Sequence, residues 1–281
     1  MRISESCARC LYDRQRSRTD NAAYLAEVKD ILDHRREDDT TAYMGYLFNR
    51  LHEKYFGKGP DFSEVKKQYN DLVLGMEESL RREIEGAPDP VARALVMCRI
   101  GNYIDFGAAM YHVEQEEFLS LFGDTDMQER DLPVYRSFLK KCEEGSRFLL
   151  VCDNCGEIVL DRLLLEQLRK RFPQLRFTAL VRGGAVVNDA TEEDAIYVGL
   201  HRVAEILTNG MPIAGTILEM LPPEARAALE EADVILAKGQ ANYESMYGLG
   251  LHVFYTFLCK CDLFISRFQV PKLTGMFVEE A

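Results

Sequence analysis

The sequence has no long apolar run and no excess of positive charge, and each of these absences excludes a class of protein. No apolar run approaches the roughly 20 residues that a membrane-spanning helix needs. The amino-terminal segment lacks the apolar core of a signal peptide, so we expect a cytoplasmic protein whose eight cysteines are free thiols. The net charge of −12 repels nucleic acid, and we expect neither a nucleic-acid nor a membrane partner.

Several well-known catalytic motifs are also missing. The chain contains no GxSxG, no GxxxxGK[ST] and no GxGxxG, so a serine hydrolase, a P-loop NTPase and a dinucleotide-binding protein lose their main support. The five histidines form neither HxH nor HExxH, and we assign none of them to catalysis.

The first half of the chain has the apolar spacing of helices. With 281 residues, 47% of them apolar, the protein can bury one large core or two ordinary ones. Apolar residues recur at intervals of three and four before residue 145, with no β-rich run. The expected helices are 20–37, 40–56, 61–85, 89–111, 113–122 and 131–143.

After residue 146 short apolar runs alternate with helical segments. The runs predict strands at 147–152, 176–181, 203–207, 232–237 and 263–268, with an edge strand at 276–278. Helices are expected between them at 160–172, 192–199, 223–231 and 242–250. This alternation predicts an α/β fold with a mostly parallel sheet covered on both faces. We therefore expect a helical domain at 1–145 packed against an α/β domain at 146–281, without a flexible linker.

Polar side chains gather just beyond the ends of the predicted strands, where α/β proteins bind ligands. They are Asp153, Asn154 and Glu157 after the first strand; Arg182, Asn188 and Asp189 after the second; Lys238, Gly239, Gln240 and Asn242 after the fourth; and Lys260 near the start of the fifth. Carboxylate and amide oxygens suit a hard cation such as Mg²⁺ or Mn²⁺, and the basic side chains suit a phosphate. The alternative is that the Asp and Asn residues only cap the helices that follow.

Two further features leave alternatives open. Cys7 with Cys10, and Cys152 with Cys155, form two CxxC pairs, which together resemble a four-thiolate zinc site. However, the second pair straddles the end of a buried strand, far from the first in sequence. The first pair alone remains a candidate redox or metal pair.

Asn102 and Asp105 share one face of a predicted helix, because they are three residues apart. They are either buried hydrogen-bond partners or substrate contacts.

The order of several motifs resembles the damage-control phosphatase family over nearly the whole chain. The motifs are Asp153-Asn154-x-Gly-Glu157, Val187-Asn188-Asp189-Ala190-Thr191 and Ala237-Lys238-Gly239-Gln240-Ala241-Asn242-Tyr243-Glu244. The amino-terminal CxxC and the Asn102–Asp105 element are similar to the stand-alone microbial branch. The resemblance implies a helical bundle packed on a Rossmann-like αβα domain, and a metal-dependent phosphatase acting on sugar phosphates or on damaged or overflow metabolites.

The resemblance also implies roles for individual residues. Asp153, Asn154 and Asp189 match the family's ligands for one divalent cation (Mg²⁺, Mn²⁺, Co²⁺ or Ni²⁺). Glu157, the loop from Lys238 to Asn242, and Lys260 match its substrate contacts. Gln240 departs from the acidic residue that some relatives carry, which weakens any transfer of a sugar-phosphate preference.

Together, the residues and the resemblance predict a phosphomonoester hydrolase. Lys238 and Lys260 neutralise the phosphoryl oxygens, Arg182 contributes to phosphate binding, and Asn242 orients the ester. Asp153 or Asp189 acts as nucleophile or general base, although water attack is favoured. Two alternatives are a non-catalytic protein that binds a metal or a phosphorylated metabolite, and a thiol redox protein that uses Cys7 and Cys10. The sequence does not indicate an oligomeric state.

Overall fold

The computed structural model describes residues 1–101 and 127–281 of the chain. Asn102 and Asp105, like the helix expected at 113–122, lie outside the described residues. Within these ranges no helix combines the length and apolar character that a membrane crossing requires.

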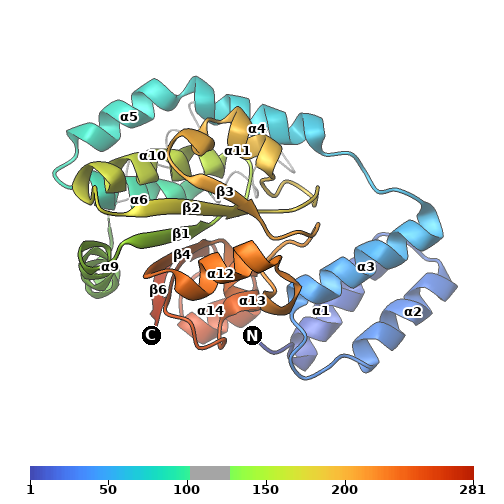
Figure 1. Ribbon diagram of the computed structural model, residues 1–281. Helices are drawn as coiled ribbons and strands as arrows, with labels where there is room; N and C mark the ends of the chain where they lie inside the picture. Colours follow the sequence, from blue (N-terminus) through green and yellow to red (C-terminus); the bar gives the residue numbers. More distant parts are fainter. Residues whose placement is uncertain (102–126) are drawn as a thin grey trace.

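A six-stranded sheet in the order β3-β2-β1-β4-β5-β6 forms the centre of the fold (Figure 1). The strands from β3 to β5 pair in parallel, and β6 pairs antiparallel with β5 at the edge. Their bounds are β1 Arg147–Val151, β2 Arg176–Val181, β3 Glu205–Thr208, β4 Val234–Lys238, β5 Val253–Leu258 and β6 Gly275–Glu280. Because both faces of the central strands are covered, these strands are nearly continuous apolar runs.

Helices cover both faces of the sheet (Figure 1). The first face carries α4 Ser63–Gly75, α5 Glu77–Gly86, α6 Pro90–Gly101, α9 Leu132–Glu144, α10 Glu157–Arg171 and α11 Glu192–Tyr197. The opposite face carries α12 Pro223–Glu231, α13 Gln240–Met246 and α14 Asp262–Phe268. Short 3-10 turns lie at Glu129–Asp131, Leu200–Arg202 and Leu218–Met220. The predicted α/β class and the three-layer arrangement are confirmed.

Three amino-terminal helices have a small core of their own. They are α1 Glu5–Arg16, α2 Ala22–Asp33 and α3 Thr41–Phe56, drawn in blue in Figure 1. Tyr24 is completely buried among them, and its hydroxyl donates to Gln15 Oε1 at 2.6 Å. This unit meets the rest of the fold beside α13, where Thr41 donates to Glu244.

Two expected elements are wrong, the strand at 263–268 and the single helix at 61–85, and helix α1 was not foreseen. The run 263–268 is helix α14, and the strand is β5 at Val253–Leu258. A short apolar run fits either structure, and here Phe264 and Phe268 lie one helical turn apart, both against Tyr243. Helix α1 was missed because its only buried residues are Ala8 and Gln15, which leave little apolar pattern.

The expected helix 61–85 is two helices that meet at Met76. Helix α4 ends at Gly75 and α5 begins at Glu77. Glycine is a poor helix former, so a break beside it costs little.

One hydrophobic core joins residues from both sides of position 145. Phe138 of α9 is fully buried and meets the rings of Phe148, Phe254 and Phe277 edge-on, at centroid distances of 6.1, 5.2 and 5.9 Å. Helices α6 and α9 therefore pack directly on the sheet, whereas α4 and α5 pack on α10 and α6. A domain boundary at 145/146 stays a prediction.

Replacing Phe138 by alanine tests this shared core. The Phe138→Ala variant should lose about 3–5 kcal/mol of unfolding free energy, because it leaves a cavity between α9 and the sheet. The measurement is urea denaturation followed by circular dichroism. Leu132→Ala, at a position that is 36% exposed on the same helix, should cost less than about 1 kcal/mol. Equal losses for both variants would contradict the role given to Phe138.

Candidate functional site

The strand order reverses between β1 and β4, and we call the space beyond the ends of these two strands the crevice. From β1 the chain proceeds to one side of the sheet, through β2 and β3, and later returns to β4 on the other side. At such a switch point the loops beyond the two strand ends diverge and leave room for a ligand. Asp153 and Asn154 follow β1, and Gly239 follows β4. The topology thus places two of the predicted ligand residues at this crevice.

Asp153, Asn154 and Asp189 lie together. Asn154 Nδ2 donates to Asp153 Oδ2 at 2.8 Å, and Asn154 forms an isolated antiparallel β-bridge with Asp189. The backbone N–H of Ala190 donates to the carbonyl of Asp153 at 2.8 Å. All three side chains are at least nine-tenths buried. The three residues predicted to bind a cation are therefore neighbours in the fold.

Arg182, at the end of β2, is completely enclosed and contacts both acids. Its Nε donates to Asp189 Oδ2 at 2.6 Å, and its Nη2 donates to Asp153 Oδ1 at 3.4 Å. Its Nη1 donates to Asn242 Oδ1 and to the carbonyl of Gly215, both at 3.2 Å. The expected contribution of Arg182 to phosphate binding stays a prediction.

Asn242 in α13 connects the ends of two strands. Its Nδ2 donates to the carbonyls of Cys152 and Lys238, at 3.1 and 2.6 Å. Its Oδ1 accepts from Arg182 Nη1 and from Thr216 Oγ1, at 3.2 and 3.0 Å. The side chain is completely buried. These bonds join the ends of β1 and β4. The expected role of Asn242 in orienting the ester stays a prediction.

Lys238 lies beneath the crevice rather than in it. Its Nζ donates to Glu157 Oε1, to Asp161 Oδ1 at 2.8 Å and to the carbonyl of Cys98 at 3.1 Å. Lys238, Glu157 and Asp161 are essentially inaccessible to solvent. Glu157 also accepts from Asn154 Nδ2 at 3.4 Å, so this buried ion cluster reaches the predicted cation ligands.

The predicted substrate loop is held by its own side chains. Gln240 Nε2 donates to Glu244 Oε1 at 2.7 Å, and Gln240 Oε1 accepts from the backbone N–H of Lys260 at 3.0 Å. Lys260 follows β5 and is partly exposed. The predicted position of Lys260 near the start of a strand is therefore corrected to a position just past the end of one, which brings it to the same edge of the sheet.

Burial raises the pKa of Asp153 to about 8, with further contributions from the negative charges of Asp189 and Glu157. Arg182 and Lys260 act in the opposite direction but do not offset these effects. This is the electrostatic environment that a divalent cation would relieve, and two carboxylates with an amide oxygen are ligands that Mg²⁺ and Mn²⁺ accept. The donor set therefore fits a hard cation. In the described ranges no group of three or more His, Cys, Asp or Glu residues is placed to hold a metal, so the amide of Asn154 is needed to complete this set.

The turn that carries Asp189 is strained. The backbone N–H of Asp189 donates to the carbonyl of Val186 at 3.0 Å, and Val187 between them has φ of +44°. This left-handed conformation is unfavourable for a β-branched residue. The next residue, Asn188, is buried, and its Nδ2 has no hydrogen-bond partner within the described structure.

The cysteines do not form a shared site. Cys7 and Cys10 lie on α1, with Cys10 exposed, whereas Cys152 and Cys155 are buried near the end of β1. Burial raises the pKa of both Cys152 and Cys155 above the ordinary thiol value. The four-thiolate zinc arrangement is therefore not formed. Cys7 and Cys10 stay a candidate redox or metal pair.

Sequence reasoning missed the loop after β3. Asn209 follows β3 as Asp153 follows β1; its Nδ2 donates to the carbonyl of Gly215, and its Oδ1 accepts from the N–H of Gly183, at 3.2 and 2.7 Å. Thr216 in this loop bonds Asn242. The signal was an Asn-Gly pair directly after a predicted strand, at the same edge as the other polar residues.

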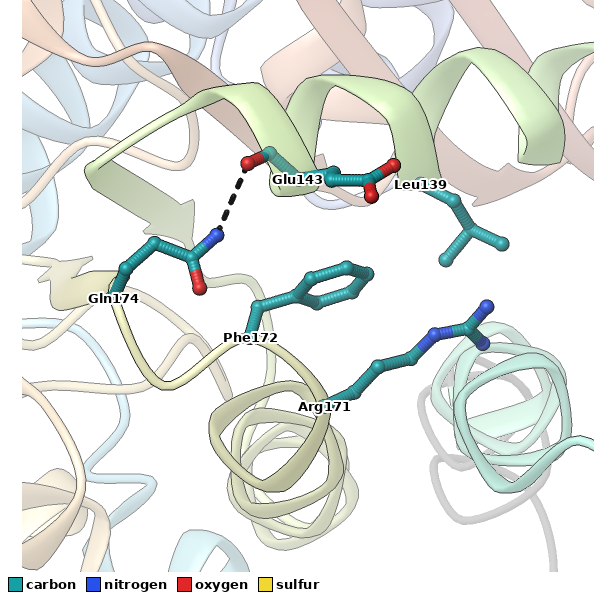
Figure 2. Close-up of a pocket in the computed structure, with 5 residues that line it drawn as sticks. All are labelled: Leu139, Glu143, Arg171, Phe172 and Gln174. Carbon is teal, nitrogen blue, oxygen red and sulfur yellow. Dashed lines mark hydrogen bonds between the residues drawn. The ribbon is translucent and has the colours of Figure 1, made fainter.

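Figure 2 shows an open pocket of about 470 Å³ elsewhere on the protein. It is lined by Leu139, Glu143, Arg171, Phe172 and Gln174. Arg171 is the last residue of α10, whereas Glu157 in the candidate site is the first. Gln174 donates to the carbonyls of Cys142 and Glu143, so its amide serves to join α9 to the loop before β2 (Figure 2). This pocket takes no part in the candidate site.

Comparison with known proteins decides the family. Residues 2–274 match the family described as the damage-control phosphatase ARMT1-like domain. The chain belongs to this family. It is 32% identical over 273 residues to a damage-control phosphatase of Archaeoglobus fulgidus, covering 93% of each chain. A damage-control phosphatase of Pyrococcus horikoshii is 25% identical over 251 residues, covering 89% of this chain and 85% of the relative.

The solved structure of this same Pyrococcus horikoshii protein supports the fold. The crystal structure of a DUF89 family protein from Pyrococcus horikoshii superimposes with a TM-score of 0.80 at 23% identity, covering 99% of each chain. The predicted family and fold are confirmed, and with the family the general class of enzyme, a phosphatase. The roles of the individual site residues stay predictions.

Gly239 provides a test of the crevice geometry. Its φ is +79°, and a Cβ added there would come within 1.9 Å of Asp153 Oδ2. Gly239→Ala should displace the Asp153 carboxylate and lower phosphatase activity by at least about 100-fold, measured as release of inorganic phosphate. Gly250→Ala is the matched control, since its φ is +74° and an added Cβ meets nothing within 4 Å. It should cost about 1 kcal/mol of stability and keep its activity. Parallel activity losses in both variants would show that backbone strain alone is responsible.

Asp161 predicts a pH dependence of stability. Burial raises its pKa to about 6, above the ordinary value of 3.8, although Lys238 lowers it. A raised pKa in the folded state contributes stability that is present below pH 3.8 and lost as the pH rises through 6. Asp161→Asn removes this titration. Between pH 4 and 7 the unfolding free energy of the wild type should therefore fall by roughly 3 kcal/mol more than that of the variant.

Urea denaturation at a series of pH values measures this difference. Glu224→Gln, on the exposed surface of α12, is the control and should follow the wild-type profile. An Asp161→Asn profile parallel to the wild type would contradict the assignment.

Proposed function

We propose that this chain is a divalent-metal-dependent phosphatase that hydrolyses small phosphate esters in the crevice between the ends of β1 and β4. One observation carries the proposal. Asp153 and Asp189, from loops after different strands, both contact the guanidinium of Arg182, and Asn154 contacts Asp153 through its side-chain amide and Asp189 through a backbone bridge. In this arrangement the pKa of Asp153 is raised to about 8 by burial and by its acidic neighbours.

Asp153, Asn154 and Asp189 would hold the cation, with Mg²⁺, Mn²⁺, Co²⁺ and Ni²⁺ as the candidates. When bound, a divalent cation polarises a phosphoryl oxygen and stabilises the charge that develops on it during transfer. Arg182 contributes by holding the two carboxylates at one place, and the short backbone bond from Ala190 to Asp153 fixes the loop that carries Asp189.

The two lysines contribute in different ways. Lys260 is partly exposed at the same edge, and its charge is close enough to lower the pKa of Asp153, which makes it suited to contact phosphoryl oxygens. Lys238 is enclosed with Glu157 and Asp161, and it balances the negative charge under the crevice. We therefore propose that Lys260 neutralises the phosphoryl oxygens of the ester directly. Lys238 contributes only indirectly, through its ion pair with Glu157.

Proton transfer is assigned to the two aspartates. Asp189 is paired with Arg182 at 2.6 Å, whereas the contact of Asp153 with Arg182 is 3.4 Å. The more weakly paired Asp153 carboxylate is the better proton acceptor of the two, and its Oδ2 lies beside Gly239, where an added Cβ would come within 1.9 Å of it. Small phosphorylated metabolites are the proposed substrate class, as the resemblance to the damage-control phosphatase family implies.

Asp153→Ala tests the proposal. The variant should hydrolyse p-nitrophenyl phosphate at least about 100-fold more slowly than the wild type, in assays with Mg²⁺, Mn²⁺, Co²⁺ or Ni²⁺, because a ligand and a proton acceptor are lost together. EDTA should abolish the wild-type activity, and the metal should restore it. Glu205→Gln, at the exposed amino end of β3, should retain full activity. Both variants should remain folded by circular dichroism.

The alternatives give different results in the same assays. A non-catalytic binding protein would bind Mn²⁺ and release no phosphate from any ester. A thiol redox protein would lose its function in the Cys7→Ser, Cys10→Ser double variant and would tolerate EDTA. Wild-type rates in Asp153→Ala would overturn the proposed site.

A further inference from the structure

The loop between β3 and the turn at Leu218–Met220 packs against the buried side of the site. Thr216 in this loop is completely inaccessible to solvent. Its backbone N–H donates to Ser245 Oγ at 2.9 Å, and its Oγ1 donates to Asn242 Oδ1 at 3.0 Å. The preceding residue, Gly215, has φ of +130° and leaves no room for a side chain, since a Cβ would come within 2.8 Å of Ala42 and 3.1 Å of Ser245 Oγ. The loop is therefore held tightly against α13 and α3.

These contacts use the whole hydrogen-bonding capacity of the Asn242 amide. Its two N–H groups donate to carbonyls of Cys152 and Lys238, and its oxygen accepts from Thr216 and Arg182. With donors on one side and acceptors on the other, the amide has a single favourable orientation. Thr216 provides one of the two donors that select it.

The orientation of the Asn242 amide determines the orientation of the Arg182 guanidinium. Arg182 Nη1 points to Asn242 Oδ1 and to the carbonyl of Gly215, both on the side of the loop. Because the guanidinium is planar and rigid, fixing Nη1 also fixes the directions of Nε and Nη2. Those two nitrogens contact Asp189 and Asp153.

We propose that Thr216 is a positioning residue for the metal site: through Asn242 and Arg182 it fixes the relative placement of the Asp153 and Asp189 carboxylates. The inference rests on the proposed function, since it assigns to Thr216 an effect on cation binding. Thr216 touches neither carboxylate, and it acts through the side chains between them.

Thr216→Val replaces the hydroxyl by a methyl group of similar size. Asn242 Oδ1 then keeps only Arg182 as a donor, and the guanidinium is less firmly held. Substituting a residue that orients the metal-ligating side chains without binding the metal typically changes metal affinity by about 10–100-fold. We expect Mn²⁺ to bind Thr216→Val about 10-fold more weakly than the wild type, while kcat at saturating Mn²⁺ changes less than the affinity does.

The experiment measures Mn²⁺ binding to the full chain by isothermal titration calorimetry, with phosphate release from p-nitrophenyl phosphate measured across a Mn²⁺ series. Thr216→Ser keeps the hydroxyl and should restore wild-type affinity. Thr178→Val, in the middle of β2, is the matched control and should bind as the wild type does. Ser245→Ala removes the acceptor for the Thr216 N–H and should also weaken Mn²⁺ binding. This variant tests the inference if Thr216→Val does not fold.

The outcomes separate the two proposals. Weaker Mn²⁺ binding in folded Thr216→Val or Ser245→Ala, with normal binding in Thr216→Ser and Thr178→Val, supports the inference. Wild-type affinity in the folded Thr216→Val variant, or in Ser245→Ala where Thr216→Val is unfolded, overturns the inference and leaves the proposed function intact. A wild-type protein that neither binds Mn²⁺ nor hydrolyses the ester overturns both.

Discussion

The structure of the site depends on one buried guanidinium. Arg182 lies between the loops that follow β1, β2 and β3, and its nitrogens reach Asp153, Asp189, Asn242 and the carbonyl of Gly215. Two buried carboxylates so close together would repel each other without a cation beside them. The guanidinium permits both to occupy the crevice, and it leaves a centre that is still short of positive charge, as the raised pKa of Asp153 indicates.

A second buried ion cluster, formed by Lys238, Glu157 and Asp161, supports the one around Arg182. Lys238, at the end of β4, is shared by Glu157 and Asp161 on successive turns of α10. This cluster ties the sheet to the helix that begins directly after Asp153 and Asn154. Removing Lys238 would leave two buried carboxylates without a cation beside them, which is far more costly than the cluster itself is favourable. The position of the crevice is thus fixed by interactions on both sides of the strand ends.

Much of the fold was predictable because the central strands and their connecting helices have distinct apolar patterns. The runs at Arg147–Val151, Arg176–Val181 and Val234–Lys238 were correctly placed, and the edge position of β6 was foreseen. The error at 263–268 arose because an apolar run shorter than two helical turns carries no period of its own. Packing against Tyr243 decided that this segment is helical.

The sequence alone determined that Asp153, Asn154 and Arg182 come to the carboxyl edge of the sheet, because each closely follows a strand and parallel strands end at the same edge. The sequence did not determine which partners the site residues contact. Only the tertiary structure placed Lys238 under the crevice and Lys260 at its edge, enclosed Arg182 among protein acceptors, and brought Thr216 from a fourth loop to Asn242. Such contacts join segments far apart in the chain, and no local pattern records them, because they follow from the order in which the strands pair.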